Sequence, residues 1–260
     1  MMRLFHVSDV HFGCEDEAAV AWFERLVKDE RPDAVIMSGD LTMRARRTEF
    51  DAGLAWLQRL AVPTTVEVGN HDLPAYNLFT RFVRPYHRYH KVERLIEKPL
   101  DLPGVAIVPL VTTARFQFRL DWSKGNVTRR ELNKALALVA EAPQDALVLV
   151  ACHHPLIEGH TRATSDTRHG AEALAALAEA GVAGVLTGHV HDPFDITHDL
   201  DGHRIRMIGA GTLSRRTRDT PPSFNEVRID GGKFDVVVRT LSPEPARVLP
   251  REHAVEDAGA

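Results

Sequence analysis

The stretch TTVEVGNHD, residues 64–72, passes from a β-strand to polar chemistry within a few residues. Its first half is β-branched and apolar, which predicts a buried strand over 64–68. Gly69, Asn70, His71 and Asp72 follow at once, so side chains suited to catalysis stand directly at the end of a strand. A turn with Asn70 in the left-handed region explains the same residues without any chemistry, and for this motif alone the two interpretations are evenly balanced.

Four further short polar motifs also follow predicted strands. They are Asp9-Val10-His11, Gly39-Asp40-Leu41-Thr42, His153-His154-Pro155 and Gly188-His189-Val190-His191. In an open α/β sheet, ligands bind beyond the carboxyl ends of the strands, so we expect the five loops to converge. Alternate residues of an extended chain point the same way, which lets Asp9 and His11 approach one metal ion together. Each motif alone is weak evidence, but the five together predict a metal site.

The segments around the motifs alternate between strand and helix periodicity. Strands are predicted over 4–7, 34–37, 64–68, 105–111, 146–151 and 182–186, and helices around 19–27, 50–61, 74–90, 128–139 and 171–180. After residue 192 helical periodicity disappears, and strands are predicted over 194–197, 204–208, 224–229 and 234–239. These elements predict an α/β fold in a single domain over 1–240, with 241–260 as a peripheral or mobile tail.

Charge and composition exclude several classes of protein. The net charge of this 260-residue chain is −4, so it lacks the basic excess of a protein that binds nucleic acid through bulk charge. The longest apolar run, 146–152, is far shorter than the roughly 20 residues of a membrane helix, and MMRLFHVSDVH turns polar too early for a signal peptide. Cys14 and Cys152 form no CxxC pair, so we expect a reducing, cytoplasmic location. Because the apolar runs are short, we expect no membrane partner.

In their order along the chain, the five motifs resemble the signature of the calcineurin-like metallophosphoesterase superfamily: D-x-H, G-D, G-N-H-D, H and G-H-x-H. They span residues 9–191 and no block is missing. The resemblance implies a four-layer α-β-β-α sandwich, in which two mixed sheets pack face to face with helices outside. It also implies two metal ions bridged by a carboxylate. Carboxylate, imidazole and amide ligands without a thiolate suit Mn, Fe, Zn or Co.

Carried over position by position, the resemblance implies the two ligand sets and the reaction. One metal ion takes Asp9, His11, Asp40 and His191, and the other takes Asp40, Asn70, His153 and His189, so Asp40 is the bridge. The family's ligand lies two residues before the proline, which selects His153 and leaves His154 a packing or hydrogen-bonding role. A metal-bridging hydroxide attacks phosphorus, and His71 protonates or stabilises the departing oxygen while Asp72 orients its imidazole.

The GDLT form at 39–42, the compact length and the spacing from Asp40 to Asn70 are most similar to bacterial class III cyclic nucleotide phosphodiesterases. This resemblance covers about residues 1–215 and implies hydrolysis of a 3′,5′-cyclic nucleotide or a similar small phosphodiester. A phosphomonoesterase stays open, as does a phosphodiesterase or pyrophosphatase on another substrate, nucleotide-linked or nucleic acid. A non-catalytic metal-binding scaffold is a further alternative.

Two local features are candidates for shaping the substrate pocket. Arg44 lies in an arginine-rich run after the GDLT loop, and Arg215 lies in another after the turn at 209–212. Arginine suits phosphate recognition, although a solvated charged rim also explains them. Aromatic and basic residues alternate between Tyr76 and Tyr89. They would stack a base, pack as an amphipathic surface or form a homodimer contact.

Overall fold

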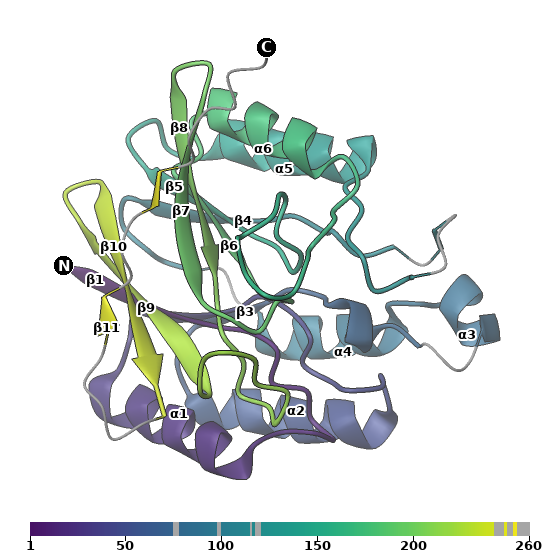
Figure 1. Ribbon diagram of the computed structural model, residues 1–260. Coiled ribbons are helices and arrows are strands. Elements are labelled where there is room, and N and C mark those ends of the chain that lie inside the picture. The colour runs from purple at the N-terminus through teal and green to yellow at the C-terminus, as the bar shows by residue number, and fades with distance from the viewer. Residues whose placement is uncertain are drawn as a thin grey trace.

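The computed structural model describes residues 1–74, 78–97, 100–114, 116–117, 121–241, 247–248 and 252–253. Within these residues, two six-stranded sheets lie face to face and helices cover both outer faces (Figure 1). The predicted four-layer sandwich with two mixed sheets is therefore confirmed. Apart from the segments left undescribed, no helix is long and apolar enough to cross a membrane.

The first sheet is built around the N-terminal strand. Its order is β11 (Arg247–Val248), β10 (Lys233–Thr240), β9 (Ser223–Asp230), β1 (Met2–Val7), β2 (Ala34–Met37) and β3 (Thr64–Val66). β1 pairs in parallel with β2 and antiparallel with β9, so it joins the two ends of the chain. Helices α1 (Glu17–Glu30), α2 (Arg47–Leu60) and α4 (His87–Ile96) lie on the outer side of this sheet, and α3 (Leu78–Val83) projects from one end (Figure 1).

The second sheet has the order β12 (Glu252–His253), β7 (Phe194–Leu200), β8 (His203–Gly209), β6 (Gly184–Thr187), β5 (Leu147–Ala151) and β4 (Val105–Pro109). Helices α5 (Arg129–Glu141) and α6 (Gly170–Glu179) cover it (Figure 1). The Thr128 hydroxyl accepts a hydrogen bond from the Glu131 backbone N–H at 3.3 Å, so Thr128 is the N-cap of α5.

Three apolar clusters hold the four layers together. One lies between the first sheet and its helices, and a second between the other sheet and α5 and α6. The third joins the sheets themselves, with Leu4, Ile36 and Val227 from the first sheet and Leu149 and Ile208 from the second. Burial on both faces explains why β2 and β5 are continuously apolar rather than alternating.

Some predicted boundaries differ from the structure. The strand predicted over 64–68 ends at Val66, and the helical stretch 74–90 is two helices, α3 and α4, separated around Pro85. Tyr76 lies outside the described residues. In the predicted tail, 242–246, 249–251 and 254–260 also lie outside them, while β11 and β12 add a short strand to the edge of each sheet.

Candidate metal centre and active site

The five polar motifs meet at one edge of the two sheets. Each begins within a few residues of the end of β1, β2, β3, β5 or β6, and these strands run parallel within each sheet. The chain bends sharply there through left-handed backbone at residues that are not glycine. The φ angles are 54° at Asp9, 51° at His11, 53° at Asp40, 71° at His189 and 65° at His191. Such conformations are costly and concentrate at functional sites.

The first group of candidate ligands is Asp9, His11 and His191. Oδ1 of Asp9 lies 3.1 Å from Nε2 of His191 and 3.5 Å from Nε2 of His11, and the two imidazole nitrogens are 3.2 Å apart. All three side chains are almost completely buried. One atom from each lies within 4.8 Å of the others, which is the spacing of groups that share a metal ion.

The second group is arranged around Asn70. Oδ1 of Asn70 lies 3.1 Å from Nε2 of His153 and 3.2 Å from Nδ1 of His189. Oδ2 of Asp40 lies 3.3 Å from Nε2 of His153 and 3.7 Å from Nε2 of His11. Asp40 therefore stands between the two groups, which is the position that a bridging ligand needs.

Backbone carbonyls fix which nitrogen of three histidines faces the centre. Nδ1 of His11, His153 and His191 donates to the carbonyls of Thr42, Ser38 and Arg216, at 3.3, 2.9 and 2.7 Å. A carbonyl only accepts, so Nδ1 carries a proton in each ring and Nε2 is the nitrogen that faces the centre and is available to a metal ion. His154 differs, because Nδ1 is 2.8 Å from the Thr112 hydroxyl and Nε2 is 2.8 Å from the Ser123 carbonyl. Both of its nitrogens have protein partners, as expected for a hydrogen-bonding role.

The donor set fits two transition-metal ions. Oδ1 of Asp9 is buried and accepts no hydrogen bond among the described residues, although two imidazole nitrogens lie close to it. Lone pairs that converge on one point without hydrogen bonding are the arrangement expected around a cation. Carboxylate, imidazole and amide donors without a thiolate suit Mn, Fe, Zn or Co.

The charges inside the site keep the carboxylates ionised. Burial alone would raise the pKa of Asp9, but the charge on His191 and the close imidazole rings of His191 and His11 hold it well below its ordinary value. Burial would lower the pKa of His153, yet Asp40 beside it raises this pKa to about 9. Burial and then the charge on His153 lower the pKa of His189 to about 3. His189 is thus a neutral imidazole at pH 7, as a metal ligand must be.

Two glycines of the motifs allow this close packing. A Cβ atom on Gly69 would lie 2.0 Å from Oδ1 of Asp40, and one on Gly188 would lie 2.5 Å from Oδ2 of Asp9. Any larger residue would displace a candidate ligand. The glycines of GNHD and GHVH are therefore required by space rather than by backbone torsion.

Asp72 does not orient His71, contrary to the expectation from the sequence. Nδ1 of His71 donates instead to the Met43 carbonyl at 2.8 Å. Oδ1 of Asp72 accepts from the Thr42 N–H at 2.8 Å, and Oδ2 accepts from the Gly69 N–H at 3.0 Å. The Asp72 carboxylate therefore ties the GDLT loop to the GNHD loop, and it acts on the site through the backbone.

The candidate substrate pocket has a volume of about 210 Å³ and opens over the two ligand groups. Its lining combines proposed ligands with a basic, polar rim: Asp40, Asn70, His71, Ser123, Lys124, Ala163, Thr164, His189, His191, Arg216 and Arg218. Arg44 and Arg215 do not line it. Both side chains are exposed, and the structure identifies Arg216 and Arg218 as the pocket arginines instead.

Arg216 is the arginine closest to the proposed chemistry. Its Nη1 lies 3.1 Å from Nε2 of His71 and 3.3 Å from Nε2 of His11. Its position depends on contacts between distant loops: its carbonyl accepts from His191, and Asp192 accepts from the backbone N–H groups of Asp219 and Thr220 at 3.1 and 3.0 Å. The arginine run at 215–218 was the available sequence signal, and these contacts decide which arginine enters the pocket.

Comparison with known proteins gives the same fold and family. The profile of calcineurin-like phosphoesterases matches residues 2–193. A glycerophosphodiester phosphodiesterase, GpdQ of Enterobacter lignolyticus, is 24% identical over 242 residues, covering 87% of this chain and 82% of the relative. A dimetal phosphatase from Danio rerio superposes with a TM-score of 0.65 at 14% identity, over 92% of this chain and 95% of that one. A purple acid phosphatase from yellow lupin seeds also has a TM-score of 0.65 at 14% identity, over 97% and 54%.

Proposed function

Because the chain belongs to the calcineurin-like phosphoesterase family and is a metal-dependent phosphoester hydrolase, we propose that it hydrolyses small phosphodiesters at the site described above. Seven residues would hold the two metal ions: Asp9, His11, Asp40, Asn70, His153, His189 and His191. The observation that carries the proposal is the Asp9 carboxylate oxygen, which is buried among imidazole nitrogens and accepts no hydrogen bond from the described residues.

The chain's own groups have separable roles in the proposed reaction. When bound, the two metal ions would activate the attacking water and neutralise charge on the phosphoryl oxygens. The Met43 carbonyl holds Nδ1 of His71 and leaves Nε2 facing the pocket, so His71 in its imidazolium form would deliver a proton from Nε2 to the departing oxygen. Arg216 lies 3.1 Å from that Nε2 and would bind a phosphoryl oxygen next to the bond that breaks.

The pocket supports a small substrate. A volume of about 210 Å³ is below the range of roughly 300–1,000 Å³ that is usual for pockets of drug-sized ligands. Among the described residues, its lining contains no phenylalanine, tyrosine or tryptophan on which a nucleobase would stack. A phosphodiester with a compact, polar alcohol group, the class named by the GpdQ relative, fits this lining best.

A 3′,5′-cyclic nucleotide is the second candidate substrate. The GDLT form at 39–42 favours it, and an aromatic cluster lies next in sequence to the pocket residue Ser123. In that cluster, Trp122 packs on Phe116 and Phe82 with ring centroids 5.7 and 6.3 Å apart. A base bound outside the pocket would stack there while the phosphodiester reached the metal ions.

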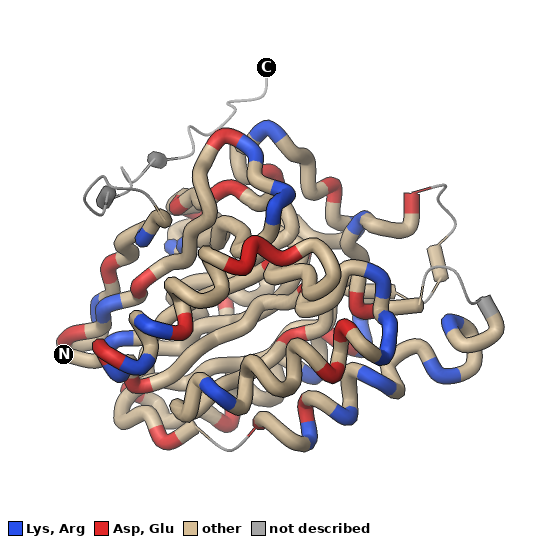
Figure 2. The backbone as a smooth tube through the Cα atoms, turned by 90° about the horizontal axis from the view of Figure 1, so that it is seen from below, with Lys and Arg blue, Asp and Glu red and all other residues tan. Residues whose placement is uncertain are grey.

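Charge on the outer face favours a small substrate over nucleic acid. Figure 2 shows lysine and arginine interspersed with aspartate and glutamate on the face that carries α1 and α2. A protein that tracks a nucleic-acid backbone uses a continuous basic stripe. The basic residues that matter for the proposal are the few at the pocket rim, Lys124, Arg216 and Arg218.

The test is a substrate panel on one Mn²⁺-loaded preparation. We would measure hydrolysis of bis-p-nitrophenyl phosphate, p-nitrophenyl phosphate, glycerophosphocholine and 3′,5′-cyclic AMP, with His71→Ala as the control. Turnover of the diesters with little monoesterase activity is expected. Turnover of cyclic AMP but not of glycerophosphocholine would select the second candidate. Dominant p-nitrophenyl phosphate turnover would make it a phosphomonoesterase, and no turnover of any compound would favour a non-catalytic scaffold.

A further inference from the structure

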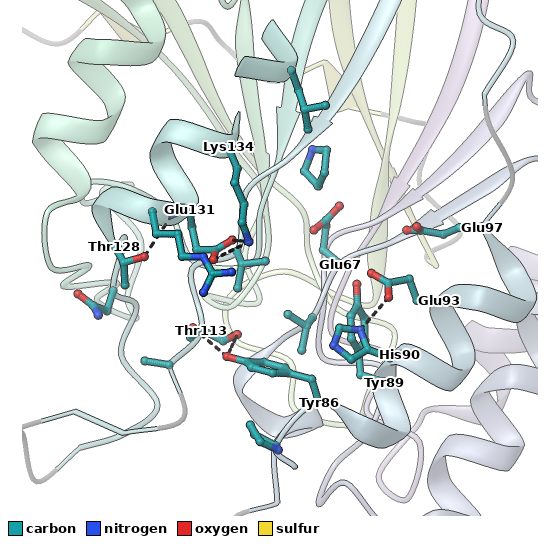
Figure 3. Close-up of a pocket in the computed structure, with 18 of the residues that line it drawn as sticks. Glu67, Tyr86, Tyr89, His90, Glu93, Glu97, Thr113, Thr128, Glu131 and Lys134 are labelled. Atoms are coloured by element: carbon teal, nitrogen blue, oxygen red, sulfur yellow. Dashed lines mark hydrogen bonds and ion pairs between the residues drawn. The ribbon is translucent and has the colours of Figure 1, made fainter. Parts of the chain in front are cut away.

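A groove outside the metal centre opens where the edge strands of the two sheets face each other. β3 ends one sheet and β4 ends the other, and α4 and α5 flank the gap between them. The groove has a volume of about 830 Å³ (Figure 3). A second cavity of about 560 Å³ shares Glu67, Glu97 and Pro109 with it and continues along β4. None of the seven proposed metal ligands lines either cavity.

Three carboxylates lie on one wall of the groove. Glu67 follows β3, while Glu93 and Glu97 belong to α4 and its end (Figure 3). Glu97 accepts from the Val66 N–H at 3.0 Å, and Glu93 lies 2.8 Å from Nδ1 of His90. Glu67 is only 5% exposed, yet its carboxylate has no hydrogen bond or ion pair within the described part of the chain. A buried carboxylate without a partner is costly, so this one is unusual.

The cost at Glu67 comes from like charge as well as from burial. Burial, followed by the negative charges of Glu97 and Glu93, raises the pKa of Glu67 well above its ordinary value. Burial and Glu93 likewise raise the pKa of Glu97. A cation between these groups would reverse the repulsion, because its attraction to each carboxylate favours the ionised form.

The rest of the lining does not supply that cation. Among the described residues, Arg130 is the arginine and Lys134 the lysine of the groove, against four carboxylates; Nζ of Lys134 lies 2.8 Å from the fourth, Glu131, and His90 contacts Glu93. Figure 3 shows Lys134 and Glu131 together on the wall opposite Glu67. Arg130 is exposed. The wall that carries Glu67 is therefore acidic and without a matching charge in the described residues.

The shape of the site favours an organic cation over a metal ion. Among the described residues, the groups whose ligand atoms lie within 4.8 Å of one another are all at the metal centre, and none includes Glu67, Glu93 or Glu97. Leu100, Val105 and Ile107 give the second cavity an apolar floor beside Glu67 and Glu97. The rings of Tyr86 and Tyr89 line the groove, and aromatic faces attract ammonium groups.

We propose that the groove binds an aliphatic diamine or polyamine, with one ammonium group between Glu67 and Glu97 and its methylene chain along Leu100, Val105 and Ile107. An ammonium group donates three hydrogen bonds and needs no rigid coordination shell, which suits carboxylates that do not bring three ligand atoms together as a metal site does. In a polyamine such as spermidine, a second arm on the other side of this ammonium group would place a further ammonium group near Glu93 and Tyr86. This binding is independent of the reaction at the metal centre.

Isothermal titration calorimetry of the metal-loaded, full chain with spermidine tests the proposal. Saturable binding is expected for the wild type, and 1,5-pentanediol, which has a similar chain but no charge, should give none. Glu67→Gln should weaken spermidine binding at least about tenfold, since it removes a desolvated charge and keeps the side-chain shape. Because that carboxylate has no partner to lose, the variant should fold. Glu97→Gln, whose amide oxygen still accepts from Val66, provides a second variant with the same expectation.

Glu179→Gln is the matched control, because it removes the same charge from an exposed position at the end of α6, away from the groove. It should bind spermidine as the wild type does. Three results would overturn the proposal: no saturable binding at millimolar spermidine, equal weakening by Glu67→Gln and Glu179→Gln, or displacement of spermidine by Mn²⁺ added beyond two equivalents.

Discussion

His71 lies among the proposed ligands, and its Nδ1 is occupied by the Met43 carbonyl. If Nε2 transfers the proton, His71→Ala should lower kcat by about 10²–10⁴-fold and leave the metal content unchanged. Asp40→Asn removes charge from the bridging position and should lower the metal content itself. Metal analysis of the two purified variants separates these outcomes. Loss of bound metal in His71→Ala would show that His71 is a ligand rather than a proton donor.

Arg216 offers a comparison with its neighbour in the sequence. Arg216 lines the pocket next to His71, whereas Arg215 points to solvent. Arg216→Ala should reduce kcat/KM for diesters by about 10–100-fold, because a charge-assisted contact to phosphate is worth about 1.5–3 kcal/mol. Arg215→Ala should stay within about twofold of the wild type. If both variants lose kcat/KM to a similar extent, the effect comes from the overall positive charge of the loop and not from a specific contact of Arg216.

The left-handed backbone of the ligand residues makes a separate prediction about stability. His191 has a φ angle of 65°. His191→Gly and His191→Ala both lose the ring, but only glycine adopts this angle freely, so the glycine variant should be more stable by about 1 kcal/mol. Urea unfolding of the chelated proteins measures the difference. The same two substitutions at Glu172, within α6, provide the control. There the alanine variant should be more stable than the glycine variant. If the alanine variant is the more stable one at both positions, backbone strain at His191 is excluded.

The sequence predicted which residues gather at the site better than it predicted their hydrogen-bond partners, for a physical reason. Each motif is a contiguous run after a strand, so spacing and strand direction suffice to bring Asp9 and His191 together. The partners of Asp72 and Arg216 depend on how separate loops pack against each other. The carbonyl that fixes His71 comes from Met43, 28 positions away in the sequence, and no local pattern marks it.

At the scale of elements, an ion-pair network ties β1, β9, β10 and α1 together. The carboxylate of Glu226 is 1% exposed and lies 2.8 Å from both Arg3 and Arg239 and 2.9 Å from Arg228, while Arg239 also contacts Glu30 at 2.8 Å. Burial opposes ionisation of Glu226, but hydrogen bonds from Arg228, Arg3 and Arg239 outweigh it and lower its pKa to about 2. The network therefore stabilises the first sheet only while Glu226 is ionised.

This network predicts a pH dependence of stability. Because the folded pKa of Glu226 is below its ordinary value of 4.5, its contribution is complete above about pH 5 and is lost as the pH falls towards 2. Glu226→Gln should lower the free energy of unfolding by about 1–3 kcal/mol at pH 7 and by less at pH 3.5. Urea unfolding at both pH values, with Glu179→Gln as control, measures this. If Glu226→Gln lowers the free energy of unfolding equally at both pH values, the role assigned to the ionised Glu226 carboxylate is wrong.

The order and type of most elements could be predicted from periodicity, but their ends could not, nor could the division of 74–90 into two helices or the strands β11 and β12. The strand predicted to reach residue 68 stops at Val66, where the side chains of Glu97 and Tyr89 bond to the N–H and carbonyl of Val66. These contacts come from a helix about thirty residues later. The groove beside Glu67 could not be predicted from the sequence either, because it forms only where the edge strands β3 and β4 of the two sheets face each other.

For the whole molecule, the proposed metal ions join loops from both sheets. Removing them with a chelator should abolish activity and lower the melting temperature, and Mn²⁺ should restore both. A ligand present at about a thousand times its Kd stabilises the fold by about 4 kcal/mol. Thermal unfolding and activity assays on the same samples measure the two effects. Full activity in the chelated, metal-free protein would contradict the proposed mechanism.

The position of β1 also constrains how the chain is made. All seven proposed ligands have been synthesised by residue 191, but β1 pairs with β9 between Met2 and Ile229, and β8 must enter between β6 and β7. A nascent chain released at that point holds every ligand while both sheets lack a central strand. Contacts over such sequence separations form late and slowly. β1 can therefore take up its final place only after β9, which ends at Asp230, has been synthesised, and we expect metal loading to follow the synthesis of that strand.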